Sequence, residues 1–133
     1  MTLDVEQFKD ENCCYLTTTG RNSGRPHTIE IWFVLNGQTL YMLAGGRYHA
    51  DWVKNALRFP EVQVKIADTT FTGKARVVND PAEDALARQI VLAKYVSRSE
   101  DDLQDWSRRS LPIAVDLIRG MRLATGIWNE YNR

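Results

Sequence analysis

The clearest strand pattern in the chain lies over residues 28–35, where Ile29, Ile31, Phe33 and Leu35 share one face and Thr28, Glu30, Trp32 and Val34 share the other. Every second residue, beginning with Ile29, is large and apolar, which is typical of a strand with one face toward a core. Asn36-Gly37 follows directly and favours a type I′ hairpin turn, because both residues tolerate positive φ angles. We therefore expect one strand over 28–35 and an antiparallel return strand over 38–44.

Shorter alternating and helical patterns fill the rest of the chain. Further strands are expected over 13–19, 62–66, 71–77 and 111–118. Helices are expected over 3–9, 49–59 and 80–96, with another beginning near Ser99. Asp80-Pro81 is typical of a helix start, and this helix is expected to bury Leu86, Ile90 and Ala93. The order predicts a mainly β (α+β) fold, a six-stranded antiparallel barrel with flanking helices, built as one domain over 1–133.

Composition narrows the classes of function. The chain has 133 residues, of which 17 are Lys or Arg and 17 are Asp or Glu. This balance argues against nucleic-acid binding, and no apolar run approaches the length of a membrane span. Cys13 and Cys14 are adjacent, which disfavours a disulfide between them, and no Cys/His spacing is typical of a metal site. The N-terminus lacks the apolar core of a signal peptide, so we expect a cytoplasmic protein.

Two glycine-containing turns are the candidates for ligand binding. In Gly20-Arg21-Asn22-Ser23-Gly24-Arg25, the glycines permit close backbone approach and the arginines offer charge and donors to an anion. Gly45-Gly46-Arg47 ends a strand just before a helix N-terminus, where free N–H groups favour an anion. Taken alone, the first segment is more often a solvated connection, and the second is equally well explained as a strand-to-helix turn.

No set of side chains forms an obvious group of catalytic residues. Tyr48 and His49 are weak candidates for proton transfer, since a lone histidine near a helix start is more often a cap or surface residue. Glu30 and Trp32 share the polar face of the first hairpin strand, where a ligand wall or a dimer interface explains the tryptophan. A site without a triad or metal cluster is typical of proteins in which a cofactor carries the chemistry.

At these turns the sequence resembles the deazaflavin (F420)-dependent nitroreductase and quinone reductase family of flavin-type split β-barrels. The family shows a T-G-R-K-S-G-like turn, a glycine pair, a W-x-x-N-L helix and an N-P-x-V strand entry. The corresponding segments here are 19–26, 44–47, 51–57 and 60–62. Asn22 stands where the family usually has lysine, Glu30 replaces a common proline, and Ala56 interrupts the asparagine-leucine pair. The resemblance implies a split β-barrel.

The resemblance also implies the contacts of the cofactor. A phosphate-bearing tail would lie between Arg21, Asn22 and Ser23 on one side and Gly45, Gly46 and Arg47 on the other. Trp52 and Asn55 would lie behind the tail, and Glu30 and Ile31 would lie beside the deazaflavin ring. Because Asn22 removes one positive charge from the phosphate site, FMN stays open as an alternative to F420.

The resulting expectation is an oxidoreductase that passes a hydride from reduced F420 to a small electron-poor acceptor, such as a quinone, nitro compound or activated alkene. Two alternatives keep the fold: an FMN-dependent oxidoreductase, and a non-enzymatic protein that binds a cofactor, haem or lipid-like ligand. The resemblance implies a homodimer. The segment 120–133, with Trp128 and Tyr131, is a candidate for contact with a partner or with the site.

Overall fold

The computed structural model describes residues 4–122, and within this range seven strands form one antiparallel sheet. The strands are β1 (Cys14–Thr19), β2 (Pro26–Ile31), β3 (Val34–Asn36), β4 (Thr39–Ala44), β5 (Glu61–Ile66), β6 (Thr69–Val77) and β7 (Leu111–Arg122). The helices are α1 (Asp51–Arg58), α2 (Pro81–Tyr95) and α3 (Gln104–Arg109), with 3-10 turns at Glu6–Phe8 and Arg47–His49. Trp128 and Tyr131 lie outside the described residues.

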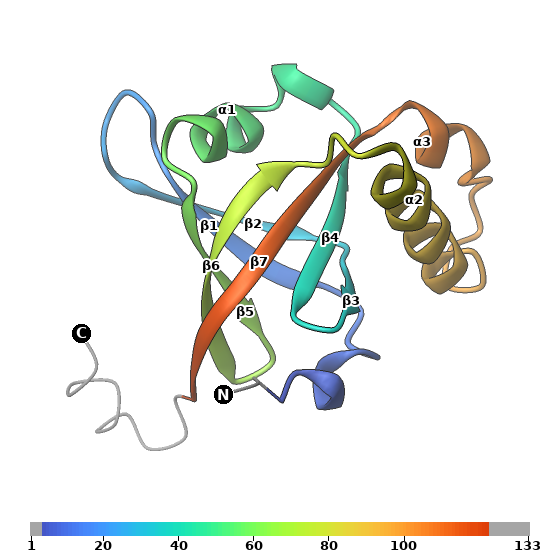
Figure 1. The fold of residues 1–133 in the computed structure, drawn as a ribbon, viewed down its shortest axis with the longest axis horizontal. Helices are drawn as coiled ribbons and strands as arrows, with labels where there is room; N and C mark the ends of the chain where they lie inside the picture. Colours follow the sequence, from blue (N-terminus) through green and yellow to red (C-terminus); the bar gives the residue numbers. More distant parts are fainter. Residues whose placement is uncertain (1–3, 123–133) are drawn as a thin grey trace.

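The sheet curls until its two edges meet. Its strand order is β2-β1-β5-β6-β7-β4-β3, so β2 and β3 stand at opposite edges. Only Trp32 and Phe33 join them, and a link of two residues reaches roughly 10 Å at most. The edges must therefore lie close together, which makes the sheet a split barrel. Figure 1 shows α1 over one end of this barrel and α2 and α3 along its side.

The prediction of six strands is wrong by one, because the strand expected over 28–35 is divided at Trp32 and Phe33. At the break, the Tyr95 hydroxyl is the hydrogen-bond partner of the Phe33 backbone. It accepts from the Phe33 amide at 2.9 Å and lies 3.1 Å from the Phe33 carbonyl oxygen. The alternation nevertheless continues across the break, because the Phe33 side chain is fully buried in the barrel core.

Elsewhere the alternation correctly located the strands. On β5 the residues Val62, Val64 and Ile66 are buried and their neighbours are exposed. The hairpin is confirmed, since β3 pairs with β4, but its turn is not the expected type I′. Asn36 pairs with Thr39 in the ladder, so the turn consists of Gly37 and Gln38, and only Gly37 has a positive φ, of 61°. No helix among residues 4–122 has the length and apolar character needed to cross a membrane.

The start of α2 was predicted correctly, but the face that it buries was not. Asp80 caps the helix by accepting from the Glu83 amide at 2.9 Å. The helix buries Ala87, Val91 and Tyr95 rather than Leu86, Ile90 and Ala93. The small Ala87 and the long Tyr95 fit the outer surface of the barrel around Trp32, while Leu86 is turned outward and 36% exposed.

Helix α3 begins at Gln104, later than the start expected near Ser99. It is held to α2 by Arg88, whose Nη1 donates at 2.8 Å to the carbonyl oxygens of Ser107, Arg108 and Ser110. These carbonyls end a short helix and need donors, so one guanidinium fixes the position of the whole segment.

Candidate functional site

The first glycine turn folds into a tight loop between β1 and β2. The Gly20 amide donates to the Arg25 carbonyl at 2.7 Å, and the Gly24 amide donates to the Gly20 carbonyl at 2.8 Å. Gly24 has φ of 73°, which favours glycine. A Cβ atom on Gly20 would lie 2.6 Å from His27 Nε2 and 2.6 Å from Ser23 Oγ, so these two side chains occupy the space beside it.

The buried side chain of Asn55 attaches this loop to α1. Its Oδ1 accepts from the Arg21 amide at 3.1 Å and from Arg21 Nη1 at 2.8 Å, and its Nδ2 donates to Thr18 Oγ1 at 3.3 Å. Arg21 Nη2 also pairs with Asp51 Oδ1 at 3.0 Å. The loop and the helix therefore form one unit, and Figure 1 shows them side by side at one end of the barrel.

Between them lies a cavity of about 560 Å³, which we call the loop–helix cleft. It brings together five of the predicted cofactor-binding residues: Arg21, Asn22, Ser23, Trp52 and Asn55. Gly20, Thr18, His27, Thr28, Ile29 and Asp51 complete its lining. The volume is in the range of small-molecule sites, and the lining mixes hydrogen-bond donors with an indole and an isoleucine.

A second cavity of about 510 Å³, which we call the tryptophan groove, contains the predicted residues Glu30 and Ile31. Its other lining residues are Trp32, Leu43, Asp101, Asp102, Leu103 and Trp106. Glu30 accepts a hydrogen bond from the Tyr15 hydroxyl at 3.1 Å, and this bond raises the pKa of Tyr15.

Trp32 forms the wall of this groove within a single chain. Its ring stacks on Tyr95 at 4.3 Å with an interplanar angle of 3°, and meets Trp106 edge to face at 5.7 Å. The half-burial of Trp32 is thus explained by α2 and α3 and needs no partner chain.

The two cavities adjoin along β2. Thr28 and Ile29 line the loop–helix cleft, and the next two residues, Glu30 and Ile31, line the tryptophan groove. Consecutive residues of β2 therefore line the two cavities.

The second glycine turn does not line the loop–helix cleft. Gly45 lies beside the tryptophan groove instead: a Cβ atom on it would be 3.6 Å from Trp106 Nε1. Arg47 has φ of 51° and its Nη1 donates to the Arg109 carbonyl at 2.7 Å, away from Arg21. The structure thus places the two turns at different cavities, and the joint grip of Gly45, Gly46 and Arg47 on the tail stays a prediction.

The weak catalytic candidates lie outside both cavities. Tyr48 is 49% exposed and His49 is also exposed, both on the 3-10 turn before α1. Neither is held against the cleft or the groove, so proton transfer by these residues stays a prediction.

Sequence reasoning missed His27, Trp106, Asp101 and Asp102 as lining residues. His27 lies opposite Thr18 in the β1–β2 ladder, so a correct register would have placed it at the cleft. Asp101, Asp102 and Trp106 follow the helix start expected near Ser99. No local pattern distinguishes residues at a helix start from residues that line a cavity.

Comparison with known proteins agrees with the split-barrel fold. The family model described as F420H(2)-dependent quinone reductase matches residues 3–117. Among solved structures, an F420 reductase is 16% identical and superposes with a TM-score of 0.64, covering 91% of this chain and 98% of that one.

Two further structures are similar to this chain. For a putative pyridoxamine 5'-phosphate oxidase from Listeria innocua, the identity is 17% and the TM-score 0.69, covering 91% of this chain and 95% of that one. For a heme storage protein from Vibrio cholerae the values are 20% and 0.67, covering 92% and 95%. At these identities the structural similarity shows the split-barrel fold.

Proposed function

The chain belongs to the F420H(2)-dependent quinone reductase family, and from this premise we propose an oxidoreductase that transfers a hydride from reduced coenzyme F420 to a small electron-poor acceptor. The acceptor classes are quinones, nitro compounds and activated alkenes. The observation that carries the proposal is the loop–helix cleft, where the loop motif and the helix motif of the family line one cavity.

The donors of this cleft fit an anionic tail. The Arg21 guanidinium, the Asn22 amide, the Ser23 hydroxyl and the His27 imidazole all line it, and each can donate a hydrogen bond. Asp51 is the opposing charge, but its side chain is 84% exposed. A solvent-exposed ion pair contributes only about 0–1 kcal/mol, so a phosphate can compete with Asp51 for Arg21.

We place the deazaflavin ring where the cleft and the groove adjoin, beside Glu30 and Ile31. Bound F420 in its reduced form supplies the hydride. The residues of the chain bind the tail and orient the ring and the acceptor. Because Tyr48 and His49 lie outside both cavities, we propose solvent as the proton source for a neutral acceptor.

Titration with F420 and FMN side by side tests the proposal. We expect F420 to bind more tightly than FMN, with a change in F420 fluorescence. Arg21→Gln should weaken F420 binding about tenfold, as expected for loss of a charge-assisted contact of about 1.4 kcal/mol. Asn22→Lys should strengthen it, because it adds a cation to the phosphate site.

Arg58→Gln is the matched control, since Arg58 is at the other end of α1 and outside both cavities. Its F420 affinity should equal that of the unsubstituted protein. Tighter binding of FMN, no response to F420, or equal effects of Arg21→Gln and Arg58→Gln would each refute the assignment.

A homodimer and a cytoplasmic location belong to the same proposal and rest on the resemblance. Sedimentation velocity at micromolar concentration measures the first: a species with twice the mass of the chain supports it, and a monomer refutes it. Fractionation of the source cells measures the second.

A further inference from the structure

The tryptophan groove has a rigid aromatic corner. Trp32 and Trp106 meet at an interplanar angle of 84°, so two indole faces stand nearly perpendicular. Trp32 is fixed from behind by its stack on Tyr95, whose hydroxyl lies 2.7 Å from the Asn12 carbonyl oxygen and 2.9 Å from the Phe33 amide. The corner is therefore preorganised for a flat ligand before anything binds.

Besides Ile31, Leu43 and Leu103, the rest of the lining consists of carboxylates. Glu30 comes from β2, and Asp101 and Asp102 come from the segment before α3, so the carboxylates enter from two elements. Among the described residues, no lysine or arginine lines the groove. Within residues 4–122, none of the three carboxylates takes part in an ion pair.

The adjoining cavities thus differ in electrostatic character. The loop–helix cleft contains Arg21, His27 and Asp51, whereas the charged side chains that line the groove among the described residues are all acidic. Indole faces attract cations through their quadrupole, and charged side chains of one sign concentrate the opposite sign. Glu30, Asp101 and Asp102 are exposed, so salt screens their attraction. An aromatic corner next to three carboxylates therefore favours a flat cation over an anion.

Building on the proposed function, we propose that the tryptophan groove takes a planar organic cation of the N-alkylated heteroaromatic class as its hydride acceptor. A cavity of about 510 Å³ is large enough for two or three fused rings. Because the two indoles are nearly perpendicular, one stacks on the face of the ring and the other meets its edge. Glu30, Asp101 and Asp102 balance the charge.

Hydride transfer to such an acceptor needs no proton from the protein. A hydride adds to the ring carbon conjugated with the cationic nitrogen, a C–H bond forms, and the π pair moves to nitrogen, which becomes neutral. The hydride, which carries both electrons, comes from the reduced deazaflavin, whose other hydrogen leaves to solvent as a proton. A quinone, by contrast, must also gain a proton, which the proposed function takes from solvent.

The carboxylates are expected to act on affinity more than on the chemical step. They stabilise the cationic acceptor, but this attraction fades as the acceptor is neutralised in the transition state. Removing them should therefore raise KM for a cation and leave kcat equal or higher. The neutral product loses the same attraction, which favours its release.

Calorimetric titration of the protein without cofactor tests the binding step. N-methylacridinium is compared with acridine, which is neutral at about pH 8. We expect the cation to bind roughly tenfold more tightly, an advantage that decreases with added salt. Glu30→Gln and the pair Asp101→Asn/Asp102→Asn should each reduce it about threefold and leave acridine binding unchanged.

Glu61→Gln on β5 is the control, because Glu61 is exposed and outside the groove. Trp106→Leu should weaken both ligands, since it removes a wall rather than a charge. Equal affinity for the two ligands, or a preference that survives loss of all three carboxylates, would overturn the inference.

Turnover separates this inference from the proposed function. Reduced F420 is mixed with protein and N-methylacridinium, and oxidised F420 is followed by its fluorescence. If F420 binds and a quinone is reduced but the acridinium is not, the acceptor assignment is wrong and the proposed function stands. If F420 does not bind at all, the proposed function is wrong, while the preference for a cation is still decided by calorimetry.

Discussion

Single side chains organise the cavities, and Asn55 is the clearest case. It is 4% exposed and its amide bonds to Arg21 and Thr18 on two other segments. An amide in this place both fills the space below the loop and satisfies the Arg21 backbone. Its removal leaves buried polar groups without partners, which costs more than the bonds themselves contribute.

Asn55→Ala should lower the free energy of unfolding by about 2 kcal/mol, measured by urea denaturation. Hydrogen exchange at the Arg21 amide should accelerate, because this amide loses its acceptor. Asn79→Ala, at an exposed position, is the control and should change stability by less than about 0.5 kcal/mol. Unchanged exchange at Arg21 would show that Asn55 does not hold the loop.

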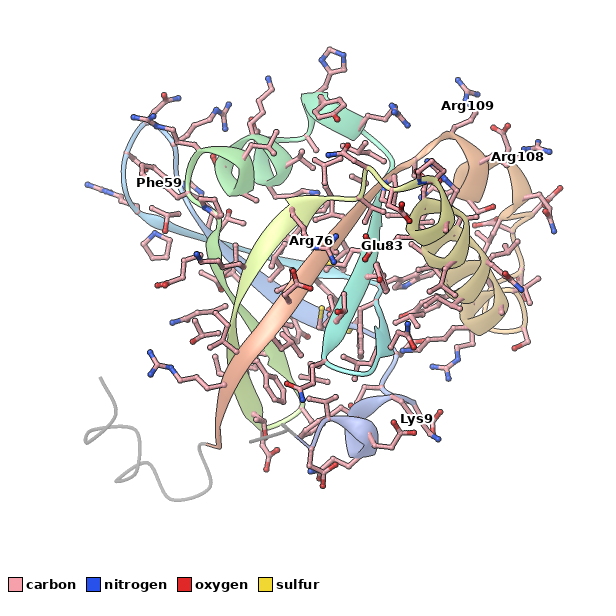
Figure 2. The ribbon with its side chains drawn as sticks, viewed as in Figure 1. Lys9, Phe59, Arg76, Glu83, Arg108 and Arg109 are labelled. Carbon is pink, nitrogen blue, oxygen red and sulfur yellow. The ribbon has the colours of Figure 1, made fainter. Side chains whose placement is uncertain are left out.

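At the scale of elements, α2 is fixed to the barrel by an ionic network. Arg76 on β6 binds Glu83 of α2 through both guanidinium Nη atoms, at 2.7 and 2.8 Å, and Asp116 of β7 through Nε at 2.7 Å. Figure 2 shows Arg76 and Glu83 facing each other between sheet and helix. The Tyr41 hydroxyl adds a bond to Glu83 at 2.6 Å. The bonds from Arg76, then Tyr41, lower the pKa of Glu83 to about 2.

This shift determines how the contact depends on pH. A carboxyl group with a lowered folded-state pKa stabilises the fold above its unfolded pKa, and the contribution is lost as pH falls from about 4.5 to about 2. Arg76 is 41% exposed, so solvent screens the network and we expect about 1–2 kcal/mol at neutral pH. Glu83→Gln should lose that amount at pH 7 and differ little from the unsubstituted protein near pH 2. An equal difference at both pH values would contradict the ionic origin.

At the scale of the whole molecule, β7 joins the two halves of the barrel. It pairs with β6 on one side and β4 on the other, and Figure 1 shows it crossing the sheet diagonally. The ladder between β6 and β7 shifts register at Thr72 and Gly73. A Cβ atom on Gly73 would lie 2.6 Å from Val115 Cγ1 and 2.8 Å from the Asp116 carbonyl oxygen. Gly73 therefore permits the close approach of the strands at this seam.

Gly73→Ala should destabilise the protein by about 1–3 kcal/mol in urea denaturation, because the Asp116 backbone must move. Gly46→Ala is the matched control, since its added Cβ would be 3.4 Å from Ala50 Cβ and its φ of −79° suits alanine. We expect no loss of stability for Gly46→Ala. Similar effects of both substitutions would refute the role of the seam.

Local patterns in the sequence determined most of the elements. Apolar alternation located β5, Asn36-Gly37 located the hairpin, and Asp80-Pro81 located the start of α2. Each of these features depends on side chains within a few residues of one another, so sequence order carries the information directly. The loop and helix motifs that line the loop–helix cleft were recognisable for the same reason.

Contacts between distant segments decided the rest. The division of the first hairpin strand depends on Tyr95, which is 62 residues from Phe33. The buried face of α2 depends on the shape of the barrel that it covers, and the tryptophan groove exists only where β2, β4 and α3 meet. Periodicity shows that a residue faces inward or outward on its own element. Which neighbour it then meets is set by the closure of the sheet, and no local pattern encodes that.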